Sequence, residues 1–170
     1  MVEHFKNDVV VELPNITSIE FQKIDKNYFK VIAINFFIVF IVFLVGLIAL
    51  QKFVFKENVN EYITYIYASF LLFFGFIFCY LLLSFPLRKY ALREKDISYK
   101  YGLWFKKMTT VPFSRIQHVE IDERPISRLL GLSSLSVYTA GDSSDDLEIK
   151  GIQKETALQI KEFISTKIDA

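Results

Sequence analysis

The sequence predicts a chain in two halves: a two-helix transmembrane hairpin, then a small α+β domain in which a bent antiparallel sheet is capped by a C-terminal helix. Hydrophobic residues make up 52% of the 170 residues while charged residues make up 23%, so the apolar residues must be concentrated in part of the chain. They gather in two uncharged blocks, and short alternating apolar and polar segments follow. We expect an N-terminal cytoplasmic, partly interfacial segment at 1–30, the transmembrane hairpin at 31–85 and a cytoplasmic domain at 86–170.

The first apolar block, 31–50, is apolar or small throughout except for Asn35. Twenty helical residues at ~1.5 Å each match the roughly 30 Å hydrocarbon core of a bilayer. The second block, 62–85, carries no charge and has several tyrosines near its start, where amphipathic rings favour the interface. A domain this small could not cover two helices that are apolar on all sides, which argues against a soluble core. Asn35 either bonds to the second helix or another subunit, or is simply tolerated near the interface.

Basic residues predict the orientation of the hairpin. The connector between the two blocks holds only Lys52 and Lys56. Four basic residues precede the first block and four follow the second: Lys6, Lys23, Lys26, Lys30, Arg88, Lys89, Arg93 and Lys95. The positive-inside rule therefore places both termini on the cytoplasmic side.

After Pro86 the pattern is typical of a small sheet. Segments rich in β-branched and aromatic residues predict strands at 88–92, 97–104, 108–112, 119–122, 134–138 and 147–149. Residues 126–130, followed by Gly131, predict one helical turn closed by a glycine. The chain ends in a predicted helix at 154–168, whose apolar stripe must be buried against the sheet. The stripe consists of Ala157, Ile160, Ile164 and Ile168.

Two runs of this half resemble a known family. YALREKDISYKYGLWFKKMTTVPFSRIQHVE and RLLGLSSLSVYTAG are similar to the bacterial pleckstrin-homology-like domain of the YdbS-like membrane proteins, in which two transmembrane helices precede the domain. The resemblance implies a multi-pass protein of the bacterial cell membrane with a pleckstrin-homology-like fold, a bent antiparallel sheet or barrel capped by a C-terminal helix. It also implies a role in membrane-associated assembly and brings no defined catalytic activity.

The residues predict no enzyme, no cofactor, no metal and no nucleic-acid partner. There is no metal-ligand spacing among the two histidines and the one cysteine, and no long basic block. Ser114, His118 and Asp122 would make a weak triad, because the serine and histidine flank a turn and the aspartate shares a strand with the histidine. The acidic run from Asp142 to Glu148 lacks the order of a calcium loop and is better interpreted as a solvated turn.

One hairpin combines large rings with cations: Trp104, Phe105, Lys106 and Lys107. This composition suits insertion into an anionic leaflet and makes these residues candidate lipid contacts. The alternative is that the rings pack in the sheet core while the lysines stay solvated, and we favour it because such a domain needs core aromatics.

Four further residues are candidate partner contacts: Arg115, His118, Arg124 and Arg128. Arginine offers a bidentate fork to phosphates and carboxylates, although ordinary surface charge explains these residues nearly as well. Phosphoinositide-binding pleckstrin-homology domains concentrate basic residues in their first hairpin, whereas the corresponding turn here is Glu94, Lys95 and Asp96.

We therefore expect a membrane-anchored interaction or scaffold module that presents its domain at the cytoplasmic face. Its partners would be the lipid bilayer and a companion membrane protein with related domains, or a second copy in a homo-oligomer. Two alternatives stay open: peripheral sensing of lipid headgroups, and an accessory role in an export system or in envelope-stress or antimicrobial-peptide resistance.

Overall fold

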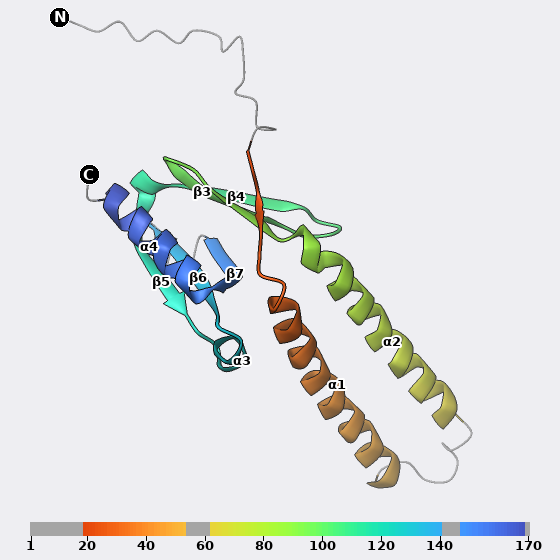
Figure 1. The fold of residues 1–170 in the computed structure, drawn as a ribbon. Coiled ribbons are helices and arrows are strands. Elements are labelled where there is room, and N and C mark those ends of the chain that lie inside the picture. Colours follow the sequence, from red (N-terminus) through yellow and green to blue (C-terminus); the bar gives the residue numbers. More distant parts are fainter. Residues whose placement is uncertain (1–18, 54–61, 141–146, 169–170) are drawn as a thin grey trace, which may run out of the picture.

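The structure is a computed structural model that describes residues 19–53, 62–140 and 147–168. Two long helices lie side by side and lead to a region of two sheets (Figure 1). In chain order the elements are β1 (Gln22–Lys23), α1 (Tyr28–Phe53), α2 (Ile63–Ser84), the 3-10 turn η3 (Phe85–Leu87), β2 (Lys89–Leu92), β3 (Asp96–Tyr101), β4 (Lys107–Pro112), the 3-10 turn η4 (Phe113–Arg115), β5 (Ile116–Asp122), α3 (Pro125–Leu129), β6 (Leu132–Thr139), β7 (Leu147–Gln153) and α4 (Lys154–Ile168).

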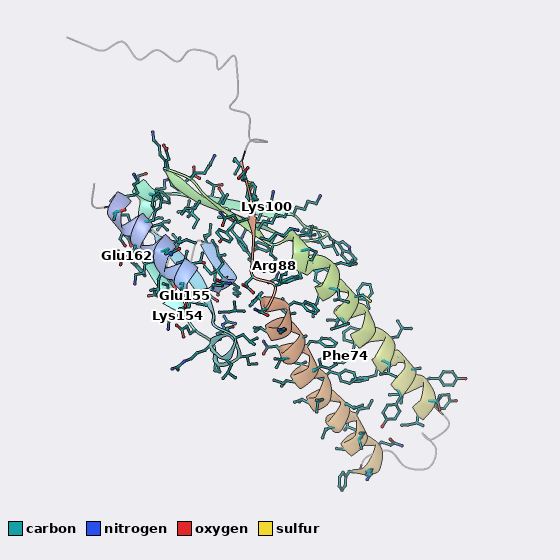
Figure 2. The ribbon with its side chains drawn as sticks, in the orientation of Figure 1. Phe74, Arg88, Lys100, Lys154, Glu155 and Glu162 are labelled. Atoms are coloured by element: carbon teal, nitrogen blue, oxygen red, sulfur yellow. The ribbon has the colours of Figure 1, made fainter. Side chains whose placement is uncertain are left out.

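Phenylalanine rings hold α1 and α2 together. Phe36 and Phe40 of α1 face Phe74 of α2 at centroid distances of 5.9 and 5.2 Å, and Figure 2 shows Phe74 pointing between the helices. Most other side chains of both helices are exposed, and only 6% of the apolar window of each helix is buried. Both helices are long and apolar enough to cross a membrane and are not core helices of this domain.

Asn35, the one polar residue of the first predicted span, donates a hydrogen bond to the carbonyl oxygen of Val31 at 2.9 Å. The described bond therefore lies within α1 and not between the helices.

The strands form two antiparallel sheets. The first has the order β1-β2-β3-β4 and the second the order β5-β6-β7. β1 pairs with β2 through Gln22↔Tyr90 and Lys23↔Lys89, so the residues just before α1 are joined to those just after α2. The two helices are thus inserted between neighbouring strands of one sheet.

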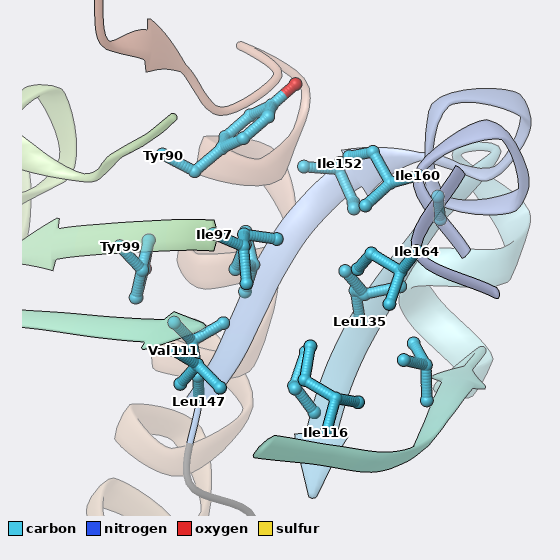
Figure 3. Close-up of a cluster of buried hydrophobic side chains, with 14 of the residues drawn as sticks. Tyr90, Ile97, Tyr99, Val111, Ile116, Leu135, Leu147, Ile152, Ile160 and Ile164 are labelled. Atoms are coloured by element: carbon cyan, nitrogen blue, oxygen red, sulfur yellow. The ribbon is translucent and has the colours of Figure 1, made fainter. Parts of the chain in front are cut away.

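One hydrophobic core is shared by both sheets and α4 (Figure 3). Ile97 and Val111 enter it from the first sheet, Leu135 and Ile149 from the second, and Ile164 from α4. Ile97, Leu135, Ile149 and Ile164 are each 0% exposed. α4 lies across the second sheet, which confirms the predicted capping helix and its apolar stripe, apart from the exposed Ile168.

The predicted fold class is confirmed: two apolar helices, then antiparallel sheets and a C-terminal helix. Two details differ. β1 was not predicted, because a strand of two residues has no readable period. The strand predicted to reach Trp104 ends at Tyr101, because Gly102 turns the chain with a φ of +105°.

Candidate functional site

The tip of the β3–β4 hairpin carries exposed rings beside α2. Trp104 is 70% exposed and Phe105 is 90% exposed, so the expectation that these rings pack in the sheet core is wrong. The Trp104 ring instead lies 6.3 Å from Phe76 and 6.2 Å from Tyr80. These residues precede the end of α2 by eight and four positions, or ~12 and ~6 Å along the helix. The tip therefore lies alongside the last turns of an apolar helix.

Gly102 shapes this tip. Its φ of +105° is a conformation that other residues rarely adopt. A Cβ at this position would also overlap the backbone carbonyl of Phe105. The glycine thus lets the chain fold back closely enough to project Trp104 and Phe105 beyond the sheet.

Lys106 and Lys107 follow the rings and are exposed. Lys107 lies at the edge of the sheet and borders a hollow of about 370 Å³ together with Arg88 and Tyr99. Burial raises the pKa of the Tyr99 phenol to about 12, and the nearby Arg88 charge offsets part of this increase. The phenol stays neutral at physiological pH, and the charged residues around this hollow are of both signs, because Glu148 lines it together with Lys150, Arg88 and Lys107.

Arg124 directly precedes α3 and Arg128 lies within it. The helices α3 and α1 contact each other. A hollow of about 420 Å³ between them is lined by Val31 and Asn35 of α1 and by Arg124 and Ile126. Arg124 lies 3.7 Å from Glu148, and Arg128 lies 3.9 Å from Glu123. Both predicted partner contacts thus already have acidic neighbours within the domain.

His118 stacks on Tyr138 at a centroid distance of 4.4 Å and lies 3.6 Å from Glu120. Its described neighbours are therefore not the serine and aspartate of the weak triad. Arg115 is exposed in η4. Arg115, His118 and Arg124 come from η4, β5 and the segment before α3, and the role of these residues as partner contacts stays a prediction.

Sequence reasoning missed two residues near the tip, Lys89 and Lys100. They are partners in the β2–β3 register and point away from the core, because the next residues, Tyr90 and Tyr99, point into it. The alternation of side chains along β2 and β3 is the sequence signal for this surface. The prediction from the basic residues after the second apolar block concerned only the orientation of the hairpin.

Within the residues that the structure describes, no group of three or more His, Cys, Asp or Glu is placed to hold a metal ion. Most of the acidic run near Asp142 lies outside the described residues. The site's chemistry is that of exposed rings and cations, which suits binding.

Two antiparallel sheets around one core, closed by a C-terminal helix, define a pleckstrin-homology-like α+β domain. Comparison with protein families matches residues 29–168 to the family described as bacterial PH domain. The chain belongs to this bacterial PH domain family, and the match includes most of α1 and all of α2. Neither a curated protein nor a solved structure gave a match.

Proposed function

We propose that this protein is a membrane-anchored, non-catalytic scaffold that holds a PH domain against the inner face of the bacterial cell membrane. Residues 31–85 form the transmembrane hairpin and both termini are cytoplasmic. The domain binds a companion membrane protein that carries related domains, or a second copy of this chain.

The observation that carries this proposal is the direct connection between helices and sheet. η3 is all that separates α2 from β2, and β1 reaches α1 through a four-residue turn closed by hydrogen bonds. In that turn, the amide of Asp25 donates to the carbonyl of Gly151 in β7 at 2.9 Å. A domain held this tightly has one orientation on its anchor, so it presents a fixed surface at high effective concentration to other proteins in the membrane.

Two apolar tips support the same orientation. Trp104 contacts α2 and is followed by the exposed Phe105, and Leu129, which is 86% exposed, ends α3, which contacts α1. Each tip is flanked by cations, as expected for protein surfaces that meet an anionic leaflet. α4 lies on the far side of the second sheet and faces the cytoplasm in this arrangement (Figure 1).

Two measurements test the proposal. A reporter fused after Ala170 should be active only in the cytoplasm, and an external signal would overturn the orientation. Cross-linking in native membranes, followed by purification in several mild detergents, should recover a stoichiometric companion or a homo-oligomer. Recovery of monomer alone in every condition would overturn the scaffold role.

A second function, peripheral contact with lipid headgroups, is favoured by the position of Trp104 against α2. Trp104 is the only tryptophan in the chain, so intrinsic fluorescence reports on the tip alone. In proteoliposomes, lipids brominated along the acyl chain should quench this fluorescence. Emission like that of water-exposed tryptophan, without quenching, would rule out this contact.

A further inference from the structure

A row of lysines crosses the outer face of the first sheet. Lys23 of β1 pairs with Lys89 of β2, and Lys89 pairs with Lys100 of β3. Directly opposed side chains on neighbouring strands have Cβ atoms about 5 Å apart, and like charges at this spacing repel each other. This repulsion between lysines does not stabilise the sheet. We therefore expect an anionic ligand to neutralise the row.

A hollow of about 290 Å³ adjoins the row. It is lined by Leu87, Lys89, Lys100, Tyr101, Gly102, Lys106, Lys107 and Met108. Lys89 and Lys100 are half-buried, while Lys106 and Lys107 are exposed at its rim. The hollow is therefore lined by four lysines, which come from the three strands β2, β3 and β4 and from the turn before β4.

These four lysines lack acidic partners. Among the described residues, none of the four has a carboxylate oxygen within 4.0 Å. The Nζ of Lys100 lies 3.6 Å from the centre of the Phe21 ring, which holds the side chain in place and leaves its charge uncompensated by an anion. Figure 2 labels Lys100 close to the end of α2.

The walls indicate the ligand class. Leu87 is the last residue of η3, directly after the apolar helix α2, and Met108 and Tyr101 add further apolar surface. A group that offers a phosphate to the lysines and an apolar remainder to these walls, at the level where an apolar helix ends, is an anionic phospholipid.

We infer that this hollow is a binding site for a phosphate group, presented by the headgroup of an anionic phospholipid in the inner leaflet. The inference rests on the proposed membrane placement of the domain. The phosphate lies among Lys89, Lys100, Lys106 and Lys107, where it removes the repulsion within the row. The site is at the opposite end of the β2–β3 hairpin from the turn where Arg93 forms hydrogen bonds of 2.7 and 2.6 Å with Asp96.

Native mass spectrometry of the full chain in mild detergent tests the site. With an equal mixture of phosphatidylglycerol and phosphatidylcholine, the protein should retain phosphatidylglycerol selectively. The double variant Lys89→Gln, Lys100→Gln should weaken this retention about 10- to 30-fold, since each lysine near an anionic group contributes to binding. The variant Lys89→Arg, Lys100→Arg should keep it.

The matched control is Lys95→Gln, Lys161→Gln, which removes the same charge from the far end of the hairpin and from α4. It should retain phosphatidylglycerol like the wild type. Equal losses in the control and in the Lys89, Lys100 variant would overturn the site, and so would equal retention of both lipids by the wild type.

Thermal unfolding gives a second readout that a merely structural role would not reproduce. In lipid-free zwitterionic detergent, Lys89→Gln, Lys100→Gln should raise the Tm by ~1–4 °C, because the opposed charges are gone. Phosphatidylglycerol should then stabilise the wild type and not the variant. A variant that is destabilised without lipid and still stabilised by phosphatidylglycerol would contradict the inference.

Soluble glycerol 3-phosphate separates the two sources of phosphate. Millimolar glycerol 3-phosphate that displaces the lipid would support phosphate recognition at the site and show that a free phosphate suffices. No displacement at any concentration, with selective lipid retention intact, would support the lipid source. Two results together would separate the site from the membrane placement. If bromolipids do not quench Trp104 fluorescence, the proposed membrane placement is wrong. If glycerol 3-phosphate still binds and this binding requires Lys89 and Lys100, the phosphate site is supported.

Discussion

The two sheets use their charges differently. On the second sheet and the elements beside it, the basic groups of Arg124, Arg128, Lys150 and Lys154 each lie within 4.0 Å of a carboxylate. At the end of the first sheet near α2, no such pair involves the lysines of the row among the described residues. Paired charges stabilise a surface modestly, whereas unpaired charges of one sign create a field that attracts a ligand. The comparison distinguishes a face with paired charges from the face where we propose that an anionic ligand binds.

The largest effect should come from the core that joins the two sheets. Replacing Ile97, which is 0% exposed, by alanine should lower the free energy of unfolding by ~2–5 kcal/mol. Because Ile97 packs with residues of the second sheet, circular dichroism and protease resistance should report a single, earlier transition. The control, Leu129→Ala at an exposed position, should change stability in detergent by ~0.5 kcal/mol or less. Two separate transitions would show that the sheets are independent units.

The link between the second sheet and α1 should be nearly as sensitive. Gly151 has a φ of +78°, and a Cβ there would overlap the Tyr28 ring at the start of α1. Gly151→Ala should cost roughly 2–4 kcal/mol in thermal or chemical unfolding. In a Tyr28→Ala background the overlap disappears, and the cost should fall to the backbone strain of ~1–2 kcal/mol. If Gly151→Ala lowered the free energy of unfolding equally in both backgrounds, the Tyr28 ring would not be packed against Gly151.

Alkaline titration probes the first sheet. The pKa of Tyr99 is raised from 10.0 to about 12 by burial, so between these values the unfolded phenol ionises first. Stability should therefore be constant below pH 10 with respect to this group, and fall above it by up to ~1.4 kcal/mol per pH unit. Tyr99→Phe should flatten this part of the profile, whereas Tyr101→Phe should leave it. If Tyr99→Phe left the slope of stability against pH unchanged, the slope would come from other titrating groups.

The smallest effect sharpens the comparison of charges. Glu123 lies 2.7 Å from Lys154 and 3.9 Å from Arg128, so Glu123→Gln should lower stability by ~0.5–1 kcal/mol, and high salt should reduce the loss. Glu94→Gln, in the exposed β2–β3 turn, is the control and should be close to neutral. Loss of a charge from the lysine row should act in the opposite direction. If Glu123→Gln and the loss of a lysine from the row both lowered stability in low salt, the two sheets would not differ in how they use their charges.

Much of the fold could be predicted from local patterns. The first apolar block lies within α1, and the second lies within α2 and η3 except for its first residue, Tyr62. The C-terminal helix was predicted with its observed bounds, 154–168, because long periodic segments leave a clear signal. β1 could not be predicted, since its two residues become a strand only by pairing with β2, on the other side of both helices.

The candidate site was predictable in composition and not in arrangement. The rings and cations of the β3–β4 tip were recognisable in sequence, but the contact of Trp104 with Phe76 and Tyr80 depends on how the hairpin lies over α2. The acidic neighbours of Arg124 and Arg128 likewise depend on the tertiary fold, since Glu148 belongs to a different strand. Lys89 and Lys100 form one surface only through the strand register.

In the membrane placement that we propose, the pairing of β1 with β2 makes folding of the domain depend on insertion of both helices. In a bilayer, Lys23 and Lys89 can meet only after the second helix has brought the chain back to the side from which it started. A chain that inserted only one helix would leave these two residues on opposite sides of the bilayer, and Ile24 could not pack into the core. In the proposed placement, the complete first sheet therefore forms only in chains whose two helices have both crossed the membrane.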